Sequence, residues 1–72
     1  MLDFNGGRAA RLRYLPGSFE VLAPGDWVAC AISGKRVPVQ SLRYWSSEVQ
    51  EPYASAEIAV RRYAELRAAG RL

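Results

Sequence analysis

The chain has 72 residues and a formal net charge of +3, from ten basic and seven acidic side chains, and it contains no histidine. A chain of this length can form one small domain, and its large apolar side chains must share a single small interior. Half of the residues are hydrophobic and 24% are charged, a balance typical of globular rather than disordered chains.

The first elements are predicted by two Pro-Gly pairs, at 16–17 and 24–25. Proline presets φ at the second position of a turn and glycine accepts a positive φ at the third, so each pair predicts a type II turn. The segments "RLRYL" at 11–15 and "FEVL" at 19–22 alternate charged and apolar residues and predict strands with one wet face. Residues 1–8 are glycine-rich and predict a loosely ordered N-terminus before a single domain at 9–72.

The middle of the chain predicts a hairpin followed by an aromatic segment. "WVACAI" at 27–32 is apolar on both faces, which is typical of a covered strand. Ser33 and Gly34 then favour a tight turn, and Pro38 in the returning strand "RVPV" favours an edge position, because proline cannot donate to a ladder. "SLRYWS" at 41–46 concentrates aromatic surface and is predicted to lie where sheet meets helix.

The C-terminal third changes to a helical period. Apolar residues recur three or four positions apart at Ala56, Ala59, Val60, Tyr63 and Leu66. We predict a turn at 47–51 and a helix over about 52–69, with Pro52 in its first turn, Glu51 near its positive end and Gly70 as its cap. The predicted fold is α+β: a small antiparallel β-sheet of three to four strands in a hairpin meander over about 10–45, with one C-terminal helix packed on it.

Several classes of function are disfavoured by what the sequence contains. Without histidine, the commonest general base and metal ligand is missing, and no glycine-rich phosphate loop is found, so we expect neither catalysis nor a cofactor. One cysteine cannot form an internal disulfide, the start lacks the pattern of a secretory signal, and no apolar run approaches the ~20 residues that span a bilayer. We expect a cytoplasmic chain away from membranes, either a monomer or a weak homodimer.

The segment "CAISGK", from Cys30 to Lys35, resembles a zinc knuckle with one ligand missing. A knuckle supplies two thiolates in C-x-x-C spacing and a structural site needs four ligands, but Ser33 stands where the second sulfur would be. We expect no metal and interpret Cys30 as a buried small hydrophobe. The alternative is a redox-sensing thiol, because Lys35 and Arg36 lie nearby in sequence and would lower its pKa.

Function is therefore expected at the surface. One cluster combines aromatic rings with an arginine, the composition favoured at protein–protein hot spots. It consists of Arg43, Tyr44, Trp45 and Tyr53. We predict a non-catalytic interaction module that binds an unidentified protein through these residues; alternatively, the rings join sheet to helix.

A nucleic-acid-binding surface is the rival hypothesis, because nine of the ten basic residues are arginine. The candidate face comprises Arg11, Arg13, Lys35 and Arg36, with Tyr14 or Trp45 stacking on bases. A net charge of +3 is ordinary for a small soluble domain, so protein interaction is the preferred hypothesis.

The segment from Phe19 to Glu57 resembles a small bacterial family known as a domain of unknown function. The motifs that carry the resemblance are "PGDWV", "CAISGKRVPV" and "LRYWSSEVQEPYASAE". The resemblance implies a short single-domain bacterial protein, and it implies no activity, cofactor or site residue. "CAISGKRVP" is also loosely similar to the C-x-x-C-G-K-x-I-P loops of zinc ribbons, which implies a ribbon-like hairpin that keeps the turn without the metal.

Overall fold

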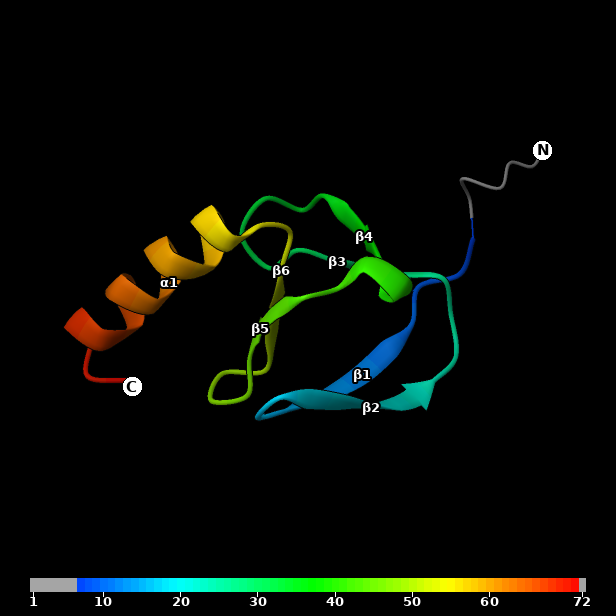
Figure 1. Cartoon of the computed structure of the whole chain (residues 1–72), viewed down its shortest axis with the longest axis horizontal. Coiled ribbons are helices and arrows are strands. Elements are labelled where there is room, and N and C mark those ends of the chain that lie inside the picture. Colours follow the sequence, from blue (N-terminus) through cyan, green and yellow to red (C-terminus); the bar gives the residue numbers. More distant parts are fainter. Residues whose placement is uncertain (1–6, 72) are drawn as a thin grey trace.

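The computed structural model describes residues 7–71, so the prediction for the N-terminus lies outside the described residues at positions 1–6. Six strands and one α-helix follow in order (Figure 1): β1 (Arg11–Leu15), β2 (Ser18–Ala23), β3 (Trp27–Ala29), β4 (Arg36–Pro38), β5 (Tyr44–Ser46), β6 (Glu51–Tyr53) and α1 (Ala56–Ala68). A turn of 3-10 helix, η2 (Val39–Ser41), lies between β4 and β5. The α+β class is confirmed.

The strands form three separate antiparallel hairpins, β1–β2, β3–β4 and β5–β6, where the sequence predicted one sheet of three to four strands. Two of the hairpins contain a proline, Pro38 in β4 and Pro52 in β6, which has no N–H to extend a ladder. Single backbone contacts join the hairpins instead, such as the 3.0 Å bond from the Ala31 N–H to the Pro52 carbonyl.

The molecule is elongated, with extents of 44 × 22 × 16 Å. Helix α1 lies at one end beside the β5–β6 hairpin, and the β1–β2 and β3–β4 hairpins lie one below the other on the far side of β5–β6 from the helix (Figure 1). The buried cluster between the hairpins contains Tyr14, Val28, Cys30, Val37 and Leu42. In a chain of this size, the few large apolar side chains therefore pack between short elements and hold them together.

Helix α1 begins at Ala56, so the predicted start at Pro52 is wrong. The hydroxyl of Ser55 caps the helix by accepting a hydrogen bond from the Ile58 N–H, whereas residues 51–53 pair with β5. Serine is among the best N-cap residues, so Ser55, three residues after Pro52, was the sequence feature that marked the true helix start. Glu51 consequently lies in β6 rather than beside the helix N-terminus, while Gly70 adopts the positive φ of 73° expected of a C-terminal cap.

The two Pro-Gly pairs use glycine differently. Gly17 has the positive φ of 79° that a type II turn requires, as predicted. Gly25 has no positive φ, and a Cβ there would lie 2.5 Å from the backbone nitrogen of Ala10. Its role is to let the segment before β1 approach the segment before β3, where Ala10 donates to the Trp27 carbonyl at 2.7 Å.

Candidate functional site

The structure separates the members of the predicted aromatic patch. Tyr53 is 1% exposed and lies in the interior, and Trp45 is half-buried. The Trp45 ring contacts Phe19 edge to face, with 5.4 Å between ring centroids, and its Nε1 donates to the Leu15 carbonyl at 2.8 Å. These two rings therefore join β5 and β6 to the rest of the fold.

Arg43 and Tyr44 are the exposed members of that patch, and Tyr44 is 37% exposed. Arg43 directly precedes β5, and Tyr44 is the first residue of that strand. The paired strand β6 contributes only Tyr53 to the predicted patch, and Tyr53 is buried. The surface that these four residues offer to a partner is therefore one arginine and part of one tyrosine.

A polar network attaches α1 to β6. The Arg62 guanidinium contacts Glu51 through two nitrogens, at 3.0 and 3.2 Å, and Glu65 through a third at 3.1 Å. Tyr53 donates its hydroxyl to the same Glu51 carboxylate at 2.8 Å. The Arg62 hydrogen bonds hold the pKa of Glu51 below its usual value, while burial, with the Glu51 contact second, raises the pKa of Tyr53. This network is structural, because every member is engaged within the domain.

Cys30 lies in the β3–β4 hairpin and is 3% exposed. Gly34 donates its N–H to the Cys30 carbonyl at 2.9 Å, and Ser33 donates its N–H to the sulfur at 3.4 Å. Burial raises the pKa of the thiol, but hydrogen bonds from Ser33 and from neighbouring backbone N–H groups outweigh it, and the net pKa lies below the usual value. Within residues 7–71, no three cysteine, histidine or carboxylate side chains lie close enough together to hold a metal ion.

The residues of the candidate nucleic-acid face lie on two different hairpins. Arg11 and Arg13 are exposed on β1, and Arg13 lies 3.9 Å from Glu20 across the hairpin. Lys35 and Arg36 belong to the β3–β4 hairpin, where the Arg36 guanidinium stacks over the Trp27 ring, 4.2 Å from its centroid. Both pairs are exposed, and each hairpin presents its own pair.

Sequence reasoning missed the outward side of α1. Ala59 and Leu66 are buried against the hairpins, but Ala56 and Val60, which belong to the same predicted apolar periodicity, are exposed. Val60 is 67% exposed, the highest value among the exposed large hydrophobic residues of the described part of the chain. The sequence did contain a sign of this exposed apolar surface, because apolar residues occupy more than one side of the predicted helix. A helix that packs through one side needs apolar residues on that side only.

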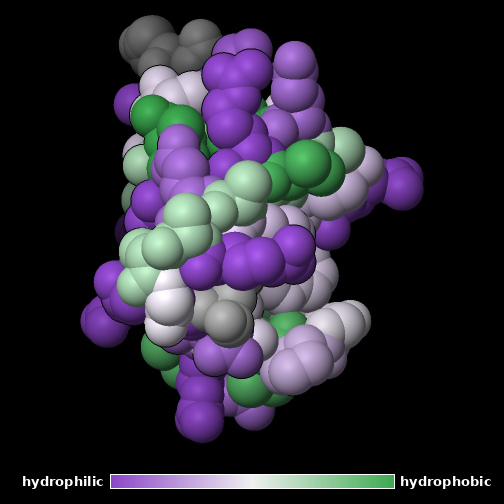
Figure 2. Space-filling view, turned by 90° about the vertical axis from the view of Figure 1, so that its left-hand side faces the viewer, coloured by the Kyte–Doolittle hydropathy of each residue, from purple (hydrophilic) through white to green (hydrophobic). Residues whose placement is uncertain are grey.

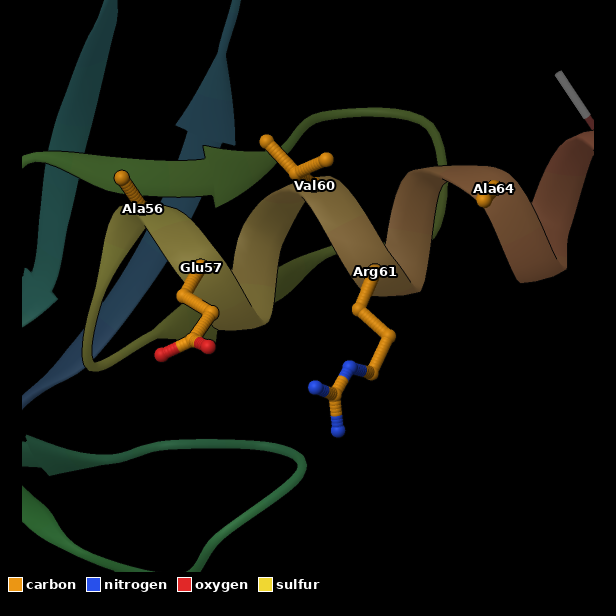
Figure 3. Close-up of a pocket in the computed structure, with 5 residues that line it drawn as sticks. All are labelled: Ala56, Glu57, Val60, Arg61 and Ala64. Carbon is orange, nitrogen blue, oxygen red and sulfur yellow. The ribbon is translucent and has the colours of Figure 1, made fainter.

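This outward side holds a shallow, open groove formed by one helix. Its lining residues, which we call the outer α1 surface, are Ala56, Glu57, Val60, Arg61 and Ala64 (Figure 3). Figure 2 looks at the end of the molecule that carries α1, where a band of weakly hydrophobic atoms crosses between hydrophilic ones. The chain therefore presents an apolar strip with one acidic and one basic side chain beside it.

Together these features define a small α+β domain of three hairpins and a helix. No helix in the described part of the chain is long and apolar enough to cross a bilayer. The family model described as "Uncharacterized protein conserved in bacteria (DUF2093)" matches residues 21–62, more than half of the chain. The chain belongs to this family, which confirms the resemblance seen in the sequence. Comparisons with curated proteins and with solved structures found no match.

Proposed function

We propose that this protein is a small non-catalytic interaction module of the bacterial cytoplasm that binds a protein partner through the outer α1 surface. The observation that carries this proposal is the exposure of Val60, at 67%, within an apolar strip on the side of α1 that faces away from the hairpins. As in the hypothesis drawn from the sequence, the proposed partner is a protein. The proposed binding surface is now the outer α1 surface and no longer the aromatic patch.

The chemistry of the outer α1 surface suits a partner helix. The alanines at 56 and 64 present little side chain, so a second backbone can approach closely, and Val60 supplies the main apolar contact. Fully burying a valine side chain contributes about 1.5–3 kcal/mol, so Val60 is the main apolar contribution to a contact that is weak. Glu57 and Arg61 sit at the rim, where charges select a partner and its orientation more than they add affinity.

The proposal is tested by comparing two exposed apolar residues. Val60→Glu places a charge in the strip without lowering helix propensity, whereas Leu22→Glu changes a residue on β2 that is 57% exposed. Crosslinking of each variant in bacterial cells should show that Val60→Glu loses a discrete crosslinked species that the native chain and Leu22→Glu retain.

Two further outcomes complete this experiment. Thermal unfolding of the purified variants should show that both keep the native fold. Retention of the crosslinked species by a folded Val60→Glu variant, or its equal loss in Leu22→Glu, would contradict binding through the outer α1 surface.

A further inference from the structure

We propose that the partner on the outer α1 surface is a second copy of this chain, with the two α1 helices antiparallel about a twofold axis beside Val60. This inference rests on the proposed function, because it names the occupant of the same surface. It is argued from the symmetry of the apolar strip, the placement of the two charges beside it and the position of α1 in the molecule.

The apolar strip is self-complementary under a twofold axis. Ala56, Val60 and Ala64 are spaced four residues apart and form one ridge along the helix. An axis through Val60 and perpendicular to the helix places each Val60 on its counterpart and each Ala56 against the partner's Ala64. Packed helices lie about 8–10 Å apart between their axes, and small side chains such as the two alanines allow the closer values.

The charges beside the strip favour the antiparallel arrangement. At about 100° per residue, Glu57 and Arg61 lie on the same flank of the ridge, and Figure 3 shows both side chains extending to one side of the helix. In an antiparallel pair, this flank of one copy lies against the same flank of the other copy. Glu57 lies about 4.5 Å before Val60 along the axis and Arg61 about 1.5 Å after it, so each Glu57 comes within about 3 Å, along the axis, of the partner's Arg61.

Symmetry makes this contact twice and also brings the two Arg61 residues within about 3 Å of each other along the axis, so the pair would contain two Glu–Arg contacts against one Arg–Arg contact. A parallel pair would instead bring the Glu57 flank against the opposite flank of the ridge. The nearest helix cation there is Arg67, which lies about 10.5 Å beyond Val60 along the axis and therefore about 15 Å along the axis from the partner's Glu57 in a parallel pair. The charge pattern is therefore complementary to itself in one orientation of the two helices.

The position of α1 leaves room for a second molecule. Its buried side packs on β5 and β6, and Figure 1 places the helix at the end of the elongated molecule. Two copies joined at this end would extend away from each other. One helix surface buries much less than the roughly 800 Å² per partner of a standard interface, so the pair is a weak dimer whose population depends on concentration.

The test is a charge exchange followed by analytical ultracentrifugation across a concentration series. Glu57→Arg turns both Glu–Arg contacts into Arg–Arg contacts, and Arg61→Glu turns both into Glu–Glu contacts, so each single variant should dimerise roughly tenfold more weakly than the native chain. An equal mixture of the two variants restores an arginine opposite a glutamate in both contacts. The mixture should therefore recover heterodimers with close to native affinity.

The matched control is Glu20→Arg, the same charge change on β2, which should dimerise like the native chain. Mixing the two variants restores dimerisation only if residues 57 and 61 meet between two copies of the chain. An ion pair between these residues within one helix would not be repaired by adding the other variant. Native protein that remains monomeric at millimolar concentration, or a mixture that stays as weak as its components, would overturn the second copy as the occupant. In that event, a crosslinked species still lost in Val60→Glu would leave the proposed binding surface standing with a different partner.

Discussion

The side-chain amide of Gln50 makes with the backbone of Tyr14 the two hydrogen bonds that a neighbouring strand would make. Its Oε1 accepts from the Tyr14 N–H at 2.9 Å, and its Nε2 donates to the Tyr14 carbonyl at 2.8 Å and to the Ser47 carbonyl at 2.8 Å. The turn between β5 and β6 is thereby attached to β1, 36 positions earlier in the chain. Gln50 holds this position with a φ of 57°, in the left-handed region.

Removing the Gln50 amide should therefore destabilise the fold although the residue is exposed. Gln50→Ala loses three hydrogen bonds and keeps the unfavourable backbone conformation, so we expect the free energy of unfolding to fall by about 1–3 kcal/mol. Gln50→Gly should cost less than Gln50→Ala, because glycine adopts a positive φ without strain. Urea denaturation measures both. Gln40→Ala, at an exposed glutamine in η2, is the control and should change stability by less than about 0.5 kcal/mol.

The two Pro-Gly turns predict an unequal response to the same substitution. Gly25→Ala should destabilise the fold severely, by about 3 kcal/mol or more, because its Cβ would meet the Ala10 backbone at 2.5 Å and backbone atoms cannot rotate away. Gly17→Ala has open space around it and should cost about 1 kcal/mol, through its positive φ only. Thermal and urea unfolding of both variants would contradict this explanation if Gly17→Ala proved the more damaging.

Local signals in the sequence predicted much of the fold. Proline and glycine marked the turn at Gly17 and the hairpin turn at Gly34, and alternation of apolar residues marked β1 and β2. These features depend on neighbouring residues, so they can be read from short stretches of sequence. The division into three hairpins depends on which strand edges meet in space, and neither periodicity nor turn chemistry carries that information.

The candidate site was harder to predict because exposure is a property of the assembled fold. Tyr53 and Tyr44 are the same residue type on paired strands, yet Tyr53 is buried beneath α1 and Tyr44 is not. Val60 was recognised as apolar, but its side of the helix was settled only by the packing of Leu66 and Ala59.

For Cys30 we predict that the reactivity of the thiol is limited by solvent access and not by its ionisation. Hydrogen bonds to the sulfur lower the pKa of the thiol, which favours the reactive thiolate, but the side chain is 3% exposed. We expect a soluble maleimide to label the native protein at pH 7 at least about 100-fold more slowly than the urea-unfolded chain, because labelling requires opening of the β3–β4 hairpin. Fast labelling without denaturant would instead favour the redox-sensing hypothesis for this thiol.

The ion pair between Glu51 and Arg62 predicts how stability responds to acid. The Arg62 hydrogen bonds lower the pKa of Glu51 in the folded chain below the value of about 4.3 for an unfolded glutamate. The pair therefore stabilises the fold fully above that unfolded value, and its contribution is lost as the pH falls through the folded pKa. Glu51→Gln should unfold at lower urea concentration than the native chain at pH 7, and the difference should shrink towards pH 2. Glu48→Gln, at an exposed carboxylate in the adjoining turn, should follow the native pH profile; an equal change in both variants would show that the Arg62 contact is not the cause.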